Sequence, residues 1–210
     1  MLTLGLDTAT DVCAVALLDG DRVLFEATLD VPRSHGRRLA PLVAQAFEHT
    51  DRTPADLGLV AVSAGPGSYT GLRIGMSTAK GLALATGADV VAVPTLRALA
   101  ATPGLDGPVA VFLPSRRGEV YAAVYDRGEP VREPSALALD AVADWLPADL
   151  AGLGGPGADR LADVRPDLAR LGLRPSAVVV ARLGRQRLRV SGADDVAALE
   201  PLYLKPVATS

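Results

Sequence analysis

Two short stretches of this 210-residue chain carry residue types suited to phosphate chemistry. The first is the pair Asp7 and Thr8, which follows a short apolar run. The second is Gly65-Pro-Gly-Ser-Tyr-Thr-Gly71, where the glycines allow a phosphate or another backbone to approach closely. Backbone N–H groups at a helix N-terminus point outward and can bind an anion. The candidate phosphate or nucleotide contacts are Asp7, Thr8, Gly65, Gly67 and Ser68.

The glycine loop does not fit the two common nucleotide motifs. A P-loop needs a lysine and a hydroxyl residue after its last glycine, but Leu72-Arg73 follow Gly71. The dinucleotide fingerprint G-x-G-x-x-G is one residue shorter than this loop. A tight turn without a ligand is an equal alternative for the loop. For Asp7, the alternative is a turn carboxylate that accepts local N–H groups.

The elements around these residues can be predicted from hydrophobic periodicity. Leu2–Leu6 and Leu59–Ala64 are predicted strands, and Asp19-Gly20 predicts a hairpin turn. Apolar residues recur at helical spacing along 36–50, and a long helix is predicted over 72–86. These elements place the glycine loop between a buried strand and a helix, so an α/β layer is expected.

Small residues recur at every fourth position of the second helix. They are Gly71, Gly75, Ala79, Ala83 and Gly87. Residues at this spacing share one helix face, where another backbone can come close. The helix is apolar on most sides, so it needs cover on most sides. Burial within one domain and contact with a second chain both satisfy this need.

The second half of the chain is predicted to form another set of strands and helices. A boundary is expected in the turn-rich stretch 102–108, which gives domains 1–104 and 105–210, with the chain end returning to the first domain as an alternative. Helices are predicted over 137–146 and 176–187. Arginines at positions 182, 185, 187 and 189 form a local basic cluster, which is either solvated surface or an RNA contact.

Composition narrows the class of protein. The net charge of −3 argues against a stand-alone nucleic-acid binder. Cys13 is the single cysteine, no apolar run approaches the roughly 18 residues of a membrane span, and a soluble cytoplasmic protein is expected. His35 and His49 stand fourteen positions apart without an acidic cluster, so no metal site is predicted.

Five blocks of sequence occur together in the register of a known family. They are 6–10 (LDTAT), 34–41 (SHGRRLAP), 65–75 (GPGSYTGLRIG), 116–121 (RRGEVY) and 201–204 (PLYL). Together they resemble the bacterial TsaB (YeaZ) family over nearly the whole chain. One departure is Pro114, which stands where relatives often have an aspartate, and it weakens the case for a ligand at that strand end.

This resemblance implies an actin-like ASKHA (ribonuclease H-like) two-lobed fold and a non-catalytic role in N6-threonylcarbamoyladenosine (t6A) modification of tRNA. It implies binding to the catalytic subunit TsaD and to the ATPase TsaE, and a homodimer when the chain is alone. It also implies that tRNA is contacted mainly through the complex. No intrinsic cofactor is implied, and ATP or ADP at the complex interface is an option. The catalytic paralogue holds a metal with a His-x-x-x-His pair, and the corresponding stretch 93–101 has no histidine. The implied interface residues are Leu39, Leu42, Val43, Ala46, Phe47, Gly71, Ile74, Gly75, Thr78, Ala79, Leu82 and Ala83. An ATPase or kinase that uses Asp7 and the glycine loop is the alternative function, and a metallopeptidase is disfavoured because no His-Glu-x-x-His occurs.

Overall fold

The computed structural model describes residues 1–30, 32–101, 107–161 and 163–204. The chain divides into two compact units. The first comprises Met1–Thr95 and Pro175–Leu202, and the second comprises Leu96–Arg174 and the chain end from Tyr203. The predicted division at 104/105 falls outside the described residues, and a whole helical segment after 174 groups with the first unit.

The first unit is built on a five-stranded sheet with the order β3-β2-β1-β4-β5. Strands β1 (Leu2–Asp7), β2 (Val12–Asp19) and β3 (Arg22–Asp30) form an antiparallel meander. Strands β4 (Leu57–Gly65) and β5 (Asp89–Pro94) run parallel to β1. The buried central strands β1 and β4 therefore end side by side at one edge of the sheet, where Asp7 and the glycine loop begin.

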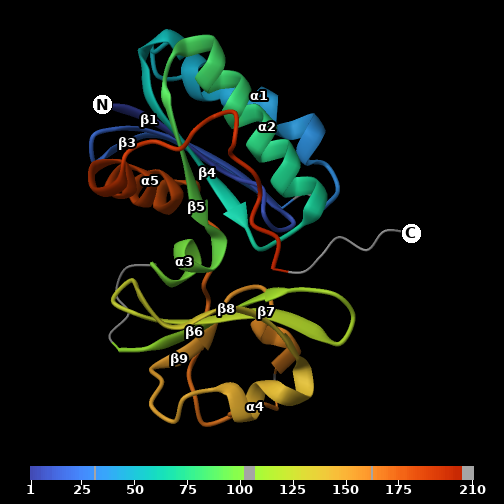
Figure 1. Cartoon of the computed structure of the whole chain (residues 1–210). Helices are drawn as coiled ribbons and strands as arrows, with labels where there is room; N and C mark the ends of the chain where they lie inside the picture. The colour runs from blue at the N-terminus through green and yellow to red at the C-terminus, as the bar shows by residue number, and fades with distance from the viewer. Residues whose placement is uncertain (31, 102–106, 162, 205–210) are drawn as a thin grey trace. The chain divides into compact units, whose positions relative to one another are not determined.

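Helices cover both faces of this sheet (Figure 1). Alternate residues of β2 point to opposite faces, so Cys13, Val15 and Leu17 pack with helices α1 (His35–Glu48) and α2 (Tyr69–Thr86). The residues between them, Ala14, Ala16 and Leu18, pack against α5 (Ala177–Ser191). A short 3₁₀ turn, Pro54–Asp56, precedes β4.

The second unit repeats the same strand topology. Its sheet has the order β10-β9-β6-β7-β8, in which β6 (Val109–Pro114), β7 (Glu119–Asp126) and β8 (Glu129–Ala138) form the meander. Strands β9 (Gly152–Gly154) and β10 (Arg170–Leu171) are parallel to β6. Helix α4 (Val142–Trp145) packs on one face, and the apolar residues of α3 (Thr95–Ala100) pack on the other. Two 3₁₀ turns span Leu139–Ala141 and Ala158–Leu161. The predicted α/β fold of the ASKHA class is confirmed.

Most predicted elements are present, and one is wrong. The hairpin at Asp19-Gly20 and the helices at 36–50, 72–86 and 176–187 are confirmed, with α2 starting three residues earlier. The helix predicted over 137–146 is mostly absent, because β8 continues to Ala138 and only four residues form α4. Leu137 pairs with Val120 of β7 instead, and its partly buried side chain packs against the core of the second unit.

Candidate functional site

The glycine loop after β4 is filled by the protein's own backbone. A Cβ atom placed on Gly67 would lie 2.2 Å from the carbonyl oxygen of Ala9, and one on Gly71 would lie 2.0 Å from that of Thr8. A Cβ on Gly65 would lie 2.5 Å from the carbonyl oxygen of Leu202. Three glycines of the motif therefore admit segments of this chain, which is the close approach that only glycine permits.

Hydrogen bonds hold the loop between β1 and β2 against the start of α2. The Thr8 hydroxyl donates to the Gly71 carbonyl at 2.8 Å, and the Ser68 N–H donates to the Ala9 carbonyl at 2.7 Å. Ser68 also caps α2, since its hydroxyl accepts the Gly71 N–H at 3.2 Å. The Leu202 N–H bonds the Ala64 carbonyl at 2.6 Å. The glycine loop therefore holds the start of α2 against the loop between β1 and β2.

Asp7 lies at the end of β1 with no solvent exposure. Its Oδ1 accepts the Ala9 N–H at 3.0 Å, but its Oδ2 has no hydrogen-bond partner among the described residues. Burial raises the pKa of Asp7 to about 6. The Ala9 N–H, the Ser63 hydroxyl and His35 each lower this pKa, but by less than burial raises it. Asp7 therefore accepts a local N–H group, as the alternative for this residue predicts, and its Oδ2 accepts no backbone N–H group among the described residues.

His35 is a buried residue beside Asp7 whose burial the sequence analysis did not predict. It is the first residue of α1, it is buried, and its Nε2 lies 3.2 Å from the Val12 carbonyl oxygen. It acts electrostatically on Asp7, so α1 begins beside the buried carboxyl. The periodicity of α1 places residue 35 on the same face as Leu39 and Leu42, which is the signal that could have revealed its burial.

All five predicted phosphate contacts are engaged with the chain itself. Asp7, Thr8 and Gly65 are buried, and Gly67 is half-buried against Ala9. Ser68 alone is exposed, and its hydroxyl caps α2. In the described part of the chain, no three histidine, cysteine or acidic side chains gather in a way that could hold a metal ion. Over the same residues, no helix is long and apolar enough to cross a membrane.

Most of the residues predicted to meet a partner face inward in this chain. All five on α1 are buried in the first unit's core, namely Leu39, Leu42, Val43, Ala46 and Phe47. On α2, Gly71, Gly75, Ala79 and Ala83 are buried, and a Cβ on Gly75 would lie 2.3 Å from the Thr8 hydroxyl oxygen. The small-residue strip serves the close approach of α2 to β1. Three predicted residues, Ile74, Thr78 and Leu82, stay partly exposed.

Helices α1 and α2 expose a second set of small and apolar residues, which we call the outer face. It consists of Ala40, Pro41, Ala44, Ser77, Gly81 and Leu84. Leu84 is 76% exposed, and a Cβ on Gly81 would meet no atom within 4 Å. Figure 1 shows the two helices side by side on the same side of the sheet. The six residues of the outer face are uncharged, and the exposed Arg37 and Glu48 lie among them on α1. An apolar partner surface could pack closely on the uncharged side chains.

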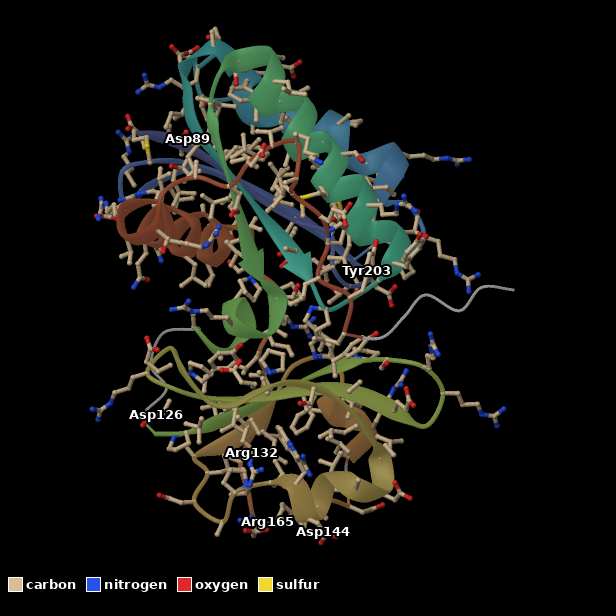
Figure 2. All side chains as sticks on the ribbon, in the orientation of Figure 1. Asp89, Asp126, Arg132, Asp144, Arg165 and Tyr203 are labelled. Atoms are coloured by element: carbon tan, nitrogen blue, oxygen red, sulfur yellow. The ribbon has the colours of Figure 1, made fainter. Side chains whose placement is uncertain are left out.

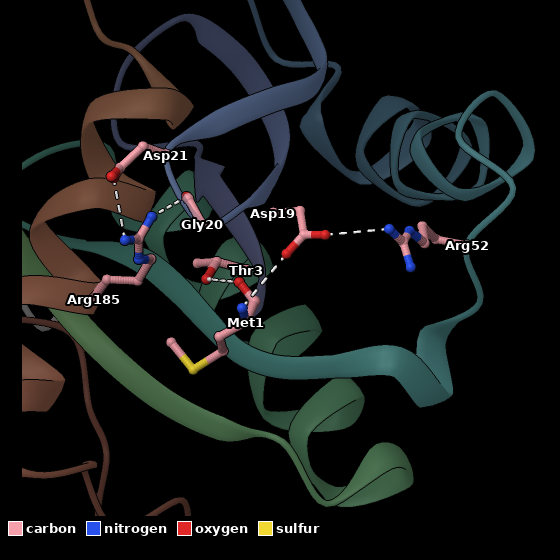
Figure 3. A network of polar contacts seen from close by, with 7 residues as sticks. All are labelled: Met1, Thr3, Asp19, Gly20, Asp21, Arg52 and Arg185. Atoms are coloured by element: carbon pink, nitrogen blue, oxygen red, sulfur yellow. Dashed lines mark hydrogen bonds and ion pairs between the residues drawn. The ribbon is translucent and has the colours of Figure 1, made fainter.

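The arginine cluster of α5 separates into structural and exposed residues. Arg185 is buried, donates to the Gly20 carbonyl and pairs with Asp21, while Asp19 of the same hairpin pairs with Arg52 (Figure 3). Arg187 pairs with Asp194, whose Oδ2 accepts the Ala92 N–H of β5 at 2.7 Å. Of the four arginines, Arg182 and Arg189 are exposed, whereas Arg185 and Arg187 pair with aspartates of the same unit.

The second unit also fills its glycine-rich loop with its own backbone. A Cβ on Gly155 would lie 2.5 Å from the Phe112 carbonyl oxygen, and the Gly157 N–H donates to that oxygen at 2.9 Å. Pro114 ends β6 exposed to solvent. Two arginines labelled in Figure 2 contact groups of the same unit. Arg132 lies 5.4 Å from the centre of the Trp145 ring, and Arg165 pairs with Asp167.

Comparison with known proteins identifies the family. The family model described as "TsaD: tRNA N6-adenosine threonylcarbamoyltransferase" matches residues 29–187. The chain is 35% identical over 148 residues to the tRNA threonylcarbamoyladenosine biosynthesis protein TsaB of Bacillus subtilis (strain 168), covering 70% of this chain and 65% of that protein. It is 37% identical over 132 residues to the TsaB protein of Escherichia coli (strain K12), covering 61% and 57%. The matches thus span somewhat under two thirds of the lengths of these relatives.

The chain belongs to this family, within its TsaB (YeaZ) group. The solved structure "YeaZ from Pseudomonas aeruginosa" agrees with it over most of both chains, with a TM-score of 0.84 and 28% sequence identity. That match covers 97% of this chain and 99% of the YeaZ chain. The two units described above are therefore those of a TsaB (YeaZ) protein, and both filled glycine loops lie inside the matched length.

Proposed function

We propose that this chain is a non-catalytic subunit that takes part in t6A formation on tRNA by binding a TsaD-type catalytic subunit. Its membership of the TsaB (YeaZ) group supports a role in this modification, because its relatives are named for it. The partner would be a protein of the same fold, since the family model that matches the chain is that of the transferase.

The observation that carries the proposal is that the glycine loop is occupied by Thr8, Ala9 and Leu202. A phosphate would have to displace backbone that is hydrogen-bonded at 2.6–2.8 Å at these points. The residues at the end of β1 and in the glycine loop thus hold α2 in place. The outer face is the part of α1 and α2 that is open to a protein partner.

We place the contact with the TsaD-type subunit on the outer face. Small side chains such as Ala44 and Gly81 let helix axes approach closely, and close approach is what determines the distance between packed helices. A second copy of the chain would use the same face, which gives a homodimer when the chain is alone. The ATPase TsaE, and ATP or ADP at the junction of subunits, belong to the assembled complex, which we place in the cytoplasm.

Reconstituted modification of tRNA tests this function. A TsaD-type subunit is assayed for t6A formation with this chain, without it, and with Ala44→Trp. We expect omission to abolish modification, and the bulky indole on the outer face to reduce it strongly. The matched control is Gln186→Trp on the exposed side of α5, which should leave modification unchanged. Equal modification with and without the chain would contradict the proposal.

A second candidate, a nucleotide hydrolase or kinase, is favoured by one observation. Apart from each other, Asp7 Oδ2 and Ser63 Oγ have no hydrogen-bond partner in the described residues, and both are buried at the ends of adjacent strands. Unpartnered buried oxygens are uncommon and can mark a ligand site. Calorimetry with ATP and Mg²⁺ on the isolated chain separates the candidates, and tight binding with turnover would favour the enzyme.

A further inference from the structure

Four arginines lie just before or within the first two turns of α1 and α2. They are Arg33, Arg37, Arg38 and Arg73, and all four are exposed. The two helices start at the same edge of the sheet, because β3 and β4 both run in the direction of β1. The first turn of α1 lies against the second turn of α2, since a Cβ on Gly36 would lie 3.7 Å from Ile74 Cδ1. We call these four residues the arginine patch.

The positive charge of the arginine patch is not neutralised within the chain. In the ranges that the structure describes, none of the four arginines forms an ion pair. The first turns of α1 and α2 contain no acid. Asp11 and Asp30 are exposed at the same edge, which leaves an excess of positive charge there. Arginines near a helix N-terminus are electrostatically unfavourable, so an anionic ligand would relieve the repulsion.

An exposed aromatic ring lies beside the patch. Tyr69 is 43% exposed, and the Arg73 guanidinium lies 5.2 Å from the centre of its ring. Arg73 also donates a hydrogen bond to the Tyr69 hydroxyl. An aromatic ring next to guanidinium groups suits RNA, because bases stack on rings while arginines bind phosphates in bidentate fashion. An acidic protein surface would use the charges but not the ring.

We propose that the arginine patch and Tyr69 contact RNA, with the arginines on backbone phosphates and the tyrosine against a base. This inference rests on the proposed function, in which the substrate of the complex is a tRNA. It differs from the contact predicted at α5, where only Arg182 and Arg189 are exposed. The patch and the outer face lie on the same two helices, so an RNA bound at the patch would lie beside the bound protein partner. Because the net charge of the chain is −3, the contact would be confined to this patch, and salt should weaken it strongly.

Fluorescence anisotropy of a labelled tRNA with the full chain at low salt tests the patch. The variant is Arg37→Gln/Arg38→Gln/Arg73→Gln. The control, Arg117→Gln/Arg182→Gln/Arg189→Gln, removes the same charge from exposed sites elsewhere. We expect the patch variant to bind at least about 10-fold more weakly, with a salt dependence shallower by about 2, since each phosphate contact with a single strand contributes about 0.7 to the slope. Tyr69→Ala should weaken binding without changing the slope.

Several outcomes would overturn the RNA contact. They are no binding by the natural chain at low salt, unchanged affinity of the patch variant, and an equal loss in the control. A patch variant that loses only its pairing with the TsaD-type subunit would identify an acidic protein surface instead. Thermal melts confirm that each variant is folded. If the patch binds RNA but modification proceeds without the chain, the proposed function fails while the RNA contact stands.

Discussion

Asp7 should destabilise the folded protein at neutral pH, and replacing it by asparagine should relieve the cost. Burial raises the pKa of Asp7 from 3.8 to about 6, so the folded state holds the proton more tightly than the unfolded state. The contribution of this group to stability is therefore complete below about pH 4 and is lost as the pH rises through about 6. Two pKa units correspond to about 3 kcal/mol.

The substitution Asp7→Asn would keep the shape and the hydrogen bond of the natural side chain without its charge. The amide oxygen can still accept the Ala9 N–H, and the amide nitrogen can donate toward the Ser63 hydroxyl. We expect Asp7→Asn to raise the free energy of unfolding by about 1–3 kcal/mol near pH 7.5, and by close to nothing near pH 4. Urea denaturation at constant ionic strength across this range measures the difference at each pH.

The control for this experiment is Asp11→Asn, which removes an exposed carboxyl from the loop that follows Asp7. Its substitution should change stability by less than about 0.5 kcal/mol, as is usual for surface positions. The reasoning is refuted if Asp7→Asn is less stable than the natural chain near pH 7.5. It is also refuted if the gain is the same at every pH, since a constant gain could not come from ionisation of Asp7.

Two further predictions concern packing and a buried cation. Gly71→Ala should lower the free energy of unfolding by about 2–4 kcal/mol, because the new methyl group would lie 2.0 Å from the Thr8 carbonyl oxygen. Gly81→Ala, on the open side of α2, should raise it by up to about 1 kcal/mol. Chemical denaturation compares the two variants, and equal effects would contradict the assigned orientation of α2. Arg185→Ala should lower the free energy of unfolding by about 2–3 kcal/mol, since it leaves the Gly20 carbonyl without its donor. Arg182→Ala, at an exposed position, should lower it by less than about 0.5 kcal/mol. Thermal melts compare the two variants, and similar melting temperatures would disprove the structural role of Arg185.

Local patterns predicted most of the fold. Alternation, the Asp19-Gly20 turn and helical periodicity indicated the strands, the hairpin and α1, because each depends on residues close in sequence. The run Ala136-Leu137-Ala138 is compatible with a helix as well as a strand, and pairing with β7 decided for the strand. The topology repeated in the two units could not be read from sequence identity, since the same sheet order tolerates different side chains.

The glycines of the loop are evident in the sequence, but their contacts with Thr8, Ala9 and Leu202 are not. The small-residue strip of α2 has the same sequence requirement whether it meets a second chain or the loop at Thr8, and only the folded structure shows that it meets Thr8. The burial of Arg185 was likewise hidden, because its partner at Gly20 lies far away in the sequence. Long-range contacts of this kind leave no periodic signal.

The affinity of this chain for a TsaD-type subunit tests the central claim most directly. Calorimetric titration would compare the natural chain with Gly81→Trp, which places an indole on the outer face where a Cβ meets no neighbouring atom, and with Gln186→Trp on α5. The account predicts that Gly81→Trp weakens pairing at least about 10-fold, a loss of about 1.4 kcal/mol, and that Gln186→Trp has no effect. Unchanged affinity of a folded Gly81→Trp variant would contradict a role of the outer face in subunit pairing.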